Sequence, residues 1–345
     1  MFKEKVMSSS LFGKPLCGNV SAPVALSFTT ATITGLLCIV TVPGNLLVLL
    51  AVFIDPYKKL KSPFNILVAN LATADLIVGL IVEPIAFTLH VKEGLGTLRE
   101  STVIVHLLYF MVCTASVLSI GALAVERYLA VQYEIKYRTE LQLKPKRLVI
   151  VLFAIWIFSC AFSFLYLQTG YIGFSFVFNH TAVALTFAIL IFTYARIFKK
   201  LRERVRRWDN VEDPIKTNQV KRQAVCHEQK ATKTLLIMLA IFVVCYFPPL
   251  PFAYIMNFCI SCSCNVVHVF RDLQLVFVLA NSCFNPIVFA WRSDKFRKAF
   301  IKIATCRKLN YRKQTSEVQI VITKLPTWCR NRNFPLNLHR RCTRI

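Results

Sequence analysis

Charged residues are missing from long stretches of this sequence. No Asp, Glu, Lys or Arg occurs in residues 15–54, 148–195 or 234–270. Overall, 17% of the residues are charged and 56% are hydrophobic, a balance that argues against an ordinary soluble globular chain of this length. Apolar stretches of about 20 residues can cross a bilayer as helices. The chain is therefore expected to be an integral membrane protein.

The apolar stretches predict an all-α fold with seven membrane-spanning helices. The uncharged interval 148–195 is too long for one crossing, so we expect a turn at its polar, Gly-containing segment "QTGYIGFS". No secretory signal peptide is expected, because the first apolar run is long enough to span and lacks a short apolar region with a cleavage site. The predicted spans lie near residues 28–54, 63–89, 101–131, 148–168, 174–198, 230–257 and 267–291.

Acidic residues are scarce, with 17 Asp and Glu against 42 Lys and Arg, for a net charge of +25. Most of the basic residues fall in segments 55–62, 132–147, 199–229 and 292–345, which alternate along the chain and so share one side of the membrane. The positive-inside rule places that side in the cytoplasm, with the amino terminus outside and the carboxyl terminus inside. The excess is therefore interpreted as a topology signal that also attracts anionic lipids, rather than as a nucleic-acid surface.

Most of the 13 cysteines lie inside predicted spans, where Cys is a small apolar residue. Outside the bilayer, Cys259, Cys262 and Cys264 fall at or near the outer loop before the seventh span, where an oxidising compartment favours disulfides. Three is an odd number, so Cys17 of the amino-terminal segment is a candidate partner for one of them. A zinc site is the alternative.

One group of polar residues lies within the predicted spans, around Asp75 at mid-depth of the second. An ionisable residue there costs roughly 2.5–3.5 kcal/mol on insertion scales, so a functional role is expected. A carboxylate with hydroxyl and amide oxygens suits a small hard cation or a water network, and the alternative is a network that only ties helices together. The group consists of Asn45, Asp75, Ser116, Asn281, Ser282 and Asn285.

A second group is Glu126, Arg127 and Tyr128, near the cytoplasmic end of the third span. Adjacent residues of a helix face different ways, so Arg127 is expected to point into the bundle while Glu126 faces the headgroups. A buried guanidinium favours a carboxylate partner, and Glu228 at the start of the sixth span is available. The alternative is ordinary interface charges that extend to water.

Prolines interrupt the last two predicted spans. Pro248, Pro249 and Pro251 are expected to kink the sixth, and Pro286 the seventh, because proline removes a backbone donor. A kinked helix beside a charge pair is a candidate moving part. Prolines are also tolerated in membrane helices that do not act as hinges.

One motif per span, in order, resembles the rhodopsin-like family of G protein-coupled receptors over roughly residues 35–305. The motifs are "GNLLV" with Asn45, "NLATADL" with Asp75, "ERY", Trp156, Tyr194 in "TYARIF", Phe242 with "CYFP" at Pro248, and "NPIVF" with Asn285 and Pro286.

The resemblance implies a seven-helix bundle followed by a short amphipathic eighth helix, here "DKFRKAF". It implies an outer segment at 1–26, the transmembrane domain at 27–291, the eighth helix at 292–305, and a basic cytoplasmic tail at 306–345 that is expected to be disordered. The protein would reside in the plasma membrane. Asn19 in "NVS" is a glycosylation sequon, and Cys306 is a palmitoylation candidate.

The resemblance also implies roles for matching residues. Arg127 would pair with Glu228 at rest and release it on activation, so that the sixth helix swings out and admits a heterotrimeric G protein. The Asp75 group would form an allosteric sodium pocket, and no other cofactor is implied. Tyr194 would stabilise the active arrangement.

Four positions depart from the family pattern. Tyr246 replaces the usual Trp, Phe289 the usual Tyr, Thr186 a Pro, and Thr102 the Cys of a common disulfide. The missing disulfide, the missing Pro and the late cysteines look most like the melanocortin-type branch.

The acids of the calcium site in that branch are not reproduced, however. Ile85, Thr102 and His106 stand at those positions, with Glu83 two places away, so melanocortin ligands are not carried over.

The ligand pocket implied by the resemblance lacks two diagnostic residues. Tyr109 stands where aminergic receptors have Asp, and Leu279 where opsins have Lys, so neither ligand class is expected. The remaining lining suits a lipophilic small molecule or a peptide, or else consists of helix-packing residues. It comprises Tyr109, Cys113, Leu250, Leu275 and Leu279, with Glu83, His106 and Arg271 near the mouth.

An ion-coupled transporter or channel, with Asp75 in an ion path, is the alternative function. Such proteins favour internal repeats and broken spans in matching halves, and the sequence has neither. An enzyme is not expected, since no nucleophile–base set or metal motif occurs.

Overall fold

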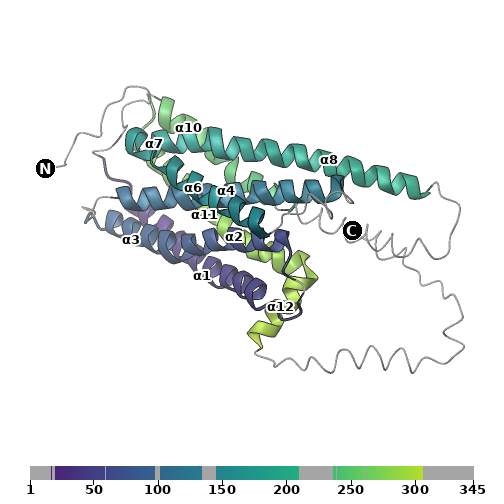
Figure 1. Ribbon diagram of the computed structural model, residues 1–345. Coiled ribbons are helices and arrows are strands. Elements are labelled where there is room, and N and C mark those ends of the chain that lie inside the picture. Colours follow the sequence, from purple (N-terminus) through teal and green to yellow (C-terminus); the bar gives the residue numbers. More distant parts are fainter. Residues whose placement is uncertain are drawn as a thin grey trace, which may run out of the picture.

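The computed structural model describes residues 17, 20–58, 60–97, 102–133, 145–209, 236–237, 239–259 and 261–305. The described residues form a bundle of long helices that run roughly along one direction and contain no β-strand (Figure 1). The elements are α1 (Val24–Ile54), α2 (Pro63–Ile77), the π-helix η1 (Val78–Val82), α3 (Glu83–Gly94), α4 (Val103–Gln132), α6 (Pro145–Ser163), α7 (Tyr166–Phe178), the π-helix η3 (Asn179–Val183), α8 (Ala184–Asp209), α10 (Pro249–Phe258), α11 (Cys264–Arg292) and α12 (Asp294–Ala304).

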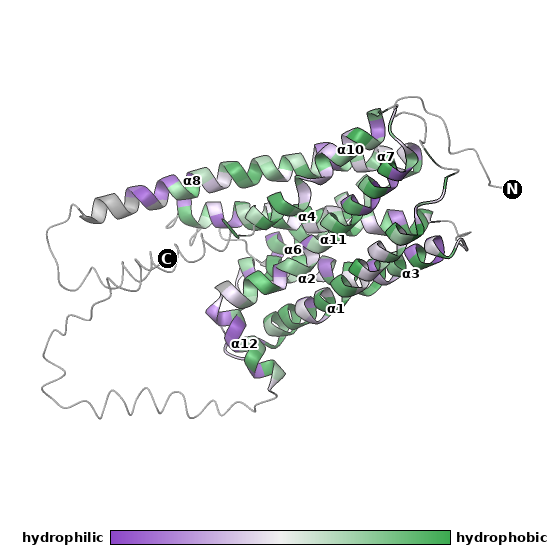
Figure 2. Ribbon diagram, turned by 180° about the vertical axis from the view of Figure 1, so that it is seen from behind, coloured by the Kyte–Doolittle hydropathy of each residue, from purple (hydrophilic) through white to green (hydrophobic). Residues whose placement is uncertain are grey.

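Seven of the helical segments are long and apolar enough to cross a membrane, which confirms the predicted fold class. Figure 2 shows hydrophobic residues along most of their length, with hydrophilic residues gathered on α12 and toward the far end of α8. Many large apolar side chains are exposed on the outside of the bundle, as expected of a surface that faces lipid. The spans are Val24–Ile54, Pro63–Gly94, Val103–Gln132, Lys146–Ser163, Tyr166–Lys200, Leu239–Phe258 and Cys264–Trp291.

The span α4 lies at the centre of the bundle and packs against α2, α6 and α8, while α1 packs against α3 and α11. Close approach of α1 to its neighbours depends on small residues. A Cβ atom on Gly44 would lie 2.7 Å from Cγ of Pro286, and one on Gly79 would lie 2.9 Å from Cγ2 of Thr41. The helix α12 follows α11 and packs on α1 and α11 through buried Phe296 and Ala299.

The turn between the fourth and fifth spans begins earlier than predicted. The chain leaves the fourth span at Phe164 and Leu165, ahead of "QTGYIGFS", and completes its reversal at Gly170. Gly170 has a φ of 68°, in the left-handed region that glycine adopts without steric cost. The apolar residues before the polar segment thus form part of the turn, a boundary that hydrophobicity alone does not mark.

The sixth span is interrupted at Phe247 and Pro248, between helical residues 239–246 and α10. Pro286 lies inside the continuous helix α11. Proline therefore interrupts the sixth span but not the seventh, because packing against neighbouring helices stabilises α11 at Pro286.

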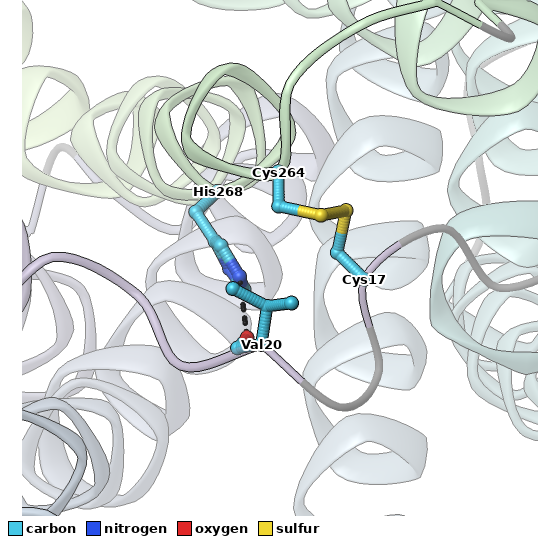
Figure 3. The surroundings of a disulfide bond; sticks show 4 residues. All are labelled: Cys17, Val20, Cys264 and His268. Atoms are coloured by element: carbon cyan, nitrogen blue, oxygen red, sulfur yellow. Dashed lines mark hydrogen bonds between the residues drawn. A yellow bond between two sulfur atoms is a disulfide. The ribbon is translucent and has the colours of Figure 1, made fainter.

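Two disulfides fasten one end of the bundle, which we call the disulfide end. Cys17 is bonded to Cys264 at the start of α11, and Cys259 to Cys262 in the preceding loop. Beside the first, His268 Nε2 lies 2.9 Å from the backbone oxygen of Val20, so the amino-terminal segment is held to α11 at two points (Figure 3). All four candidate cysteines are used, and the zinc alternative at these cysteines is not supported.

Candidate functional site

A cavity of about 340 Å³ opens at the disulfide end, between α3, α4, α7 and α11. Cys17 contributes to its wall, so the amino-terminal segment forms part of the site. The lining is mostly apolar, with a cluster of charged side chains on one side. It comprises Cys17, Val82, Ala86, Leu89, His90, Glu93, Thr102, Val105, His106, Tyr109, Tyr171, Ile172, Val267, His268, Arg271, Asp272 and Leu275.

Half of the predicted pocket residues belong to this lining, namely His106, Tyr109, Arg271 and Leu275. Cys113 and Leu279 lie one turn deeper on the same helices and are buried in the core. Glu83 points toward α1 instead, where its Oε1 accepts a hydrogen bond of 3.1 Å from the Thr41 hydroxyl. Leu250, on α10, lies outside the lining.

The charged cluster consists of His90, Glu93, Arg271 and Asp272. Glu93 Oε2 lies 3.1 Å from His90 Nδ1 and 3.0 Å from the Arg271 guanidinium, whose Nε donates to Asp272 Oδ1 at 2.7 Å. Only Arg271 was expected here from the sequence. The available signal was a His and an acid three residues apart on one helix, followed by an Arg–Asp pair near the outer end of the last span.

Two hydroxyl groups of the first span donate hydrogen bonds to this cluster. The hydroxyl of Ser27 donates to Glu93 Oε2 at 3.2 Å, and that of Thr30 donates to Asp272 Oδ2 at 2.9 Å. Ser27 and Thr30 lie three residues apart on the buried face of α1. Both carboxylates are therefore held in place by three helices.

Aromatic residues from α4 and α7 form another wall of the cavity. His106 Nδ1 lies 2.8 Å from the Tyr166 hydroxyl, and its ring centroid is 4.9 Å from that of Tyr171. Below them, Phe110 packs edge-to-face on Phe174 at 4.5 Å. Such a wall is rigid and offers a hydroxyl as well as apolar surface.

The predicted polar network around Asp75 is assembled in the bundle interior. Asp75 Oδ1 accepts hydrogen bonds from Ser116 at 3.0 Å and Ser282 at 2.8 Å, and Oδ2 accepts one from Asn285 at 2.7 Å. Asn45 donates to the backbone oxygens of Thr41 and Ser282, each at 3.0 Å. Three spans thus meet at one buried carboxylate, and Asn45 links the first span to the backbone of the seventh beside it.

The network retains unused acceptors that fit a small cation. The buried Asn45 Oδ1 accepts no hydrogen bond from the described residues. The hydroxyl oxygens of Ser116 and Ser282 keep lone pairs after donating to Asp75. Carboxylate, hydroxyl and amide oxygens are the ligands that hard cations prefer.

A separate polar cluster joins the second, third and fourth spans. Trp156 Nε1 donates to Asn70 Oδ1 at 3.0 Å, and Asn70 Nδ2 donates to Ser119 Oγ at 2.8 Å. The buried Asn70 side chain is therefore paired through both its oxygen and its nitrogen, which fixes the register of three helices.

At the opposite end of the bundle, the side chains of Glu126 and Arg127 do not face the two environments that the sequence predicted. Glu126 is buried and Arg127 is half-buried, with Arg127 Nε 3.4 Å from Glu126 Oε2 and the guanidinium carbon 3.6 Å from the centre of the Phe64 ring. Glu126 follows buried Leu123 by three residues on the packed face of α4. The expectation that Glu126 faces the headgroups is therefore wrong.

Three further residues predicted for the switch, Tyr128, Tyr194 and Phe289, lie on α4, α8 and α11. Tyr128 packs against Phe192 at a centroid distance of 5.8 Å. The hydroxyl of Tyr194 has no hydrogen-bond partner among the described residues, while buried Phe289 packs on Phe296 at 5.6 Å. The phenylalanine at 289 thus serves apolar packing.

The residues predicted as a hinge in the sixth span stack on each other. Phe242 and Tyr246 lie 4.6 Å apart between ring centroids, and both are buried. The break at Pro248 follows directly. The predicted residues Asn19, Glu228 and Cys306, and the tail 306–345, lie outside the described residues.

Comparison with known proteins places these features in a family. The family model for the 7 transmembrane receptor (rhodopsin family) matches residues 44–172 and 170–289. The guinea pig (Cavia porcellus) histamine H2 receptor is 28% identical, over 90% of each chain. The human histamine H2 receptor is 28% identical over 83% of this chain and 82% of its own. Mouse trace amine-associated receptor 9 is 30% identical over 80% and 84%.

These relatives correct two expectations. They are named for histamine and trace amines, so they do not support a melanocortin-type branch. The exclusion of amine ligands is also unsupported. That exclusion rested on Tyr109 alone, whereas Glu93 and Asp272 bring two carboxylates into the same cavity from α3 and α11.

The family model covers both halves of the bundle, from Gly44 in the first span to Phe289 in the seventh. The curated relatives are receptors rather than enzymes and match most of the chain. The chain therefore belongs to the rhodopsin family of seven-transmembrane receptors, and it is a multi-pass membrane protein.

Proposed function

We propose that the protein is a G protein-coupled receptor that binds a small, positively charged ligand in the cavity at the disulfide end. Binding would promote nucleotide exchange on a heterotrimeric G protein at the Arg127 end. The disulfide end would face the outside of the cell, as the oxidised cysteines and the basic segments of the sequence both favour.

The charge of the cavity is the observation that carries this ligand class. Two carboxylates, Glu93 and Asp272, face a single guanidinium, that of Arg271, in walls that are otherwise mostly apolar. A single cationic group with an apolar body complements this arrangement. The names of the curated relatives agree with an amine.

The volume favours a small molecule over a peptide. A cavity of about 340 Å³ lies at the lower end of the range for small-molecule sites, roughly 300–1,000 Å³. The aromatic wall at His106 and Tyr171 would hold the apolar body of the ligand, while the acids hold its charge.

A sodium ion at Asp75 forms part of this proposal. Asp75, Ser116 and Ser282 would supply oxygen ligands. The buried Asn45 oxygen, which lacks a hydrogen-bond donor among the described residues, supports a bound cation in this network. The ion would favour the resting arrangement, because it keeps the second, third and seventh spans together.

The test is a ligand screen on the full-length receptor in cells, with biosensors for several G protein classes. Small amines are compared with neutral alcohols and carboxylates of the same shape. Amines are expected to signal, and Glu93→Gln or Asp272→Asn to raise the half-maximal concentration at least about tenfold. Thr102→Val, which alters an uncharged residue of the same lining, is the control.

Equal potency of the neutral analogues would overturn the cationic ligand. A ligand-gated ion current that disappears in Asp75→Asn, without a G protein signal, would instead favour the channel alternative. Surface expression is measured for every variant, so that loss of the protein is not read as loss of response.

A further inference from the structure

Three potential metal ligands meet at the mouth of the cavity. One atom each from His90, Glu93 and Asp272 lies within 4.8 Å of the other two. His90 Nδ1 is 3.1 Å from Glu93 Oε2 and 3.9 Å from Asp272 Oδ2. Tetrahedral zinc, with bonds of about 2.0–2.2 Å, places its ligand atoms roughly 3.3–3.6 Å apart. The two distances from His90 Nδ1 are therefore close to those that zinc requires, and the two carboxylate oxygens lie within 4.8 Å of each other.

We propose that His90, Glu93 and Asp272 form a binding site for a Zn²⁺ ion. One imidazole nitrogen and two carboxylate oxygens form a ligand set that zinc accepts. Calcium takes six to eight oxygen ligands and magnesium an octahedron of oxygens, and this cluster supplies neither. Three protein ligands leave the fourth position of zinc open toward the cavity.

The carboxylates are already oriented for this role. Ser27 donates to Glu93 Oε2 and Thr30 donates to Asp272 Oδ2, the same oxygens that face His90. Hydrogen bonds of this kind orient the ligands of known metal sites. His90 and Asp272 are only 8% and 2% exposed, so the ligands lie in a protected position and their geometry is set by α3 and α11.

Arg271 is the competitor for the ion. On Asp272 it binds Oδ1 and leaves Oδ2 directed toward His90. On Glu93 it binds Oε2, the oxygen that faces His90. Its side chain is 28% exposed, so the guanidinium can turn toward solvent and yield Oε2 to zinc. Removal of Arg271 should therefore strengthen zinc binding.

Zinc would also neutralise the carboxylates that attract an amine, so it should oppose an amine agonist. That consequence rests on the proposed function. Binding of the ion itself does not, because it depends only on the three side chains.

The test measures zinc binding to the purified full-length chain in detergent, by calorimetry and by thermal unfolding without reductant. Zinc chloride is expected to raise the unfolding temperature of the wild type, whereas magnesium and calcium chloride are not. His90→Gln and Asp272→Asn should weaken this binding at least about 100-fold, and Arg271→Gln should strengthen it several-fold. An ion that binds the folded chain but not the unfolded one stabilises the folded state by RT ln(1 + [L]/Kd), so the shift in unfolding temperature reports the affinity.

His268→Gln is the matched control, since His268 also lines the cavity but its Nε2 faces the backbone oxygen of Val20. This variant should keep the zinc shift. A shift that survives in His90→Gln and in Asp272→Asn would place the ion elsewhere and overturn the proposal, as would no shift in the wild type. If the amine screen fails but the zinc shift depends on His90, the proposed ligand class falls and the metal site stands.

Discussion

Arg127 Nε lies 3.4 Å from Glu126 Oε2, so two adjacent residues of α4 form an ion pair on the packed side of the helix. The guanidinium carbon also lies 3.6 Å from the centre of the Phe64 ring of α2, a cation–π contact. The buried member of the pair is the acid. Arg127 is thus held by a carboxylate of its own helix and by an aromatic ring of α2.

Release of this pair should raise basal signalling. Glu126→Gln removes the charge while keeping the shape, and a partly buried ion pair contributes about 1 kcal/mol. Basal nucleotide exchange should therefore rise roughly fivefold, measured with purified G protein and no ligand. Asp294→Asn, which neutralises an exposed acid on α12, should leave it unchanged. A rise in Glu228→Ala but not in Glu126→Gln would show that the local pair does not restrain Arg127.

Neutralisation of Asp75 should abolish sensitivity to sodium. In the wild type, replacement of sodium by a bulky organic cation should increase agonist affinity several-fold, because the ion favours the resting arrangement. Asp75→Asn loses the only charge at the centre of that network and should give the same affinity in both salts. Ser119→Ala, one turn from Ser116 but bonded to Asn70, should respond like the wild type. Retained sodium dependence in Asp75→Asn would exclude this site.

A methyl group at Gly44 should separate the first and seventh spans. Its Cβ would lie 2.7 Å from the rigid ring of Pro286, and overpacking of this kind costs about 1–3 kcal/mol. The unfolding temperature of Gly44→Ala in detergent should fall by several degrees. Gly35→Ala is the control, since its nearest contact, with Phe87, would be 3.4 Å. Equal stability of the two variants would contradict the close packing.

Loss of the indole donor at Trp156 should weaken the centre of the bundle. Trp156→Phe leaves the buried Asn70 oxygen unpaired, at a cost of about 1 kcal/mol in membrane proteins. The unfolding temperature should fall by a few degrees. The double variant with Ser119→Ala should lose less than the sum of the two separate falls, because Trp156 and Ser119 both bond to Asn70. Trp291→Phe, at an exposed position, is the control. A fall no larger than that control would show that the indole acts only by packing.

The number of spans was predictable because hydrophobic length is a local property. An uncharged run long enough to cross the bilayer forms a helix wherever it occurs, since no water remains to satisfy its backbone. The turn was predicted at the segment that contains Gly170, but its start was placed too late for the same reason: Phe164 and Leu165 are apolar, and hydrophobicity does not distinguish them from the span.

The Asp75 group was also predictable, because buried polar residues in membrane helices must find one another. The charged cluster at the cavity was not, since His90, Glu93 and Asp272 lie near the ends of their spans, where isolated charges are common. Tyr109 alone therefore misled the prediction of the ligand class.

The sequence by itself determined seven apolar helices and the family motifs, because these depend on composition and on spacing within one helix. Only the tertiary structure decided which acid Arg127 contacts, that Cys17 bonds to Cys264, and that two distant carboxylates share one cavity. Each of these depends on how the helices rotate and pack against one another, and no local pattern encodes that.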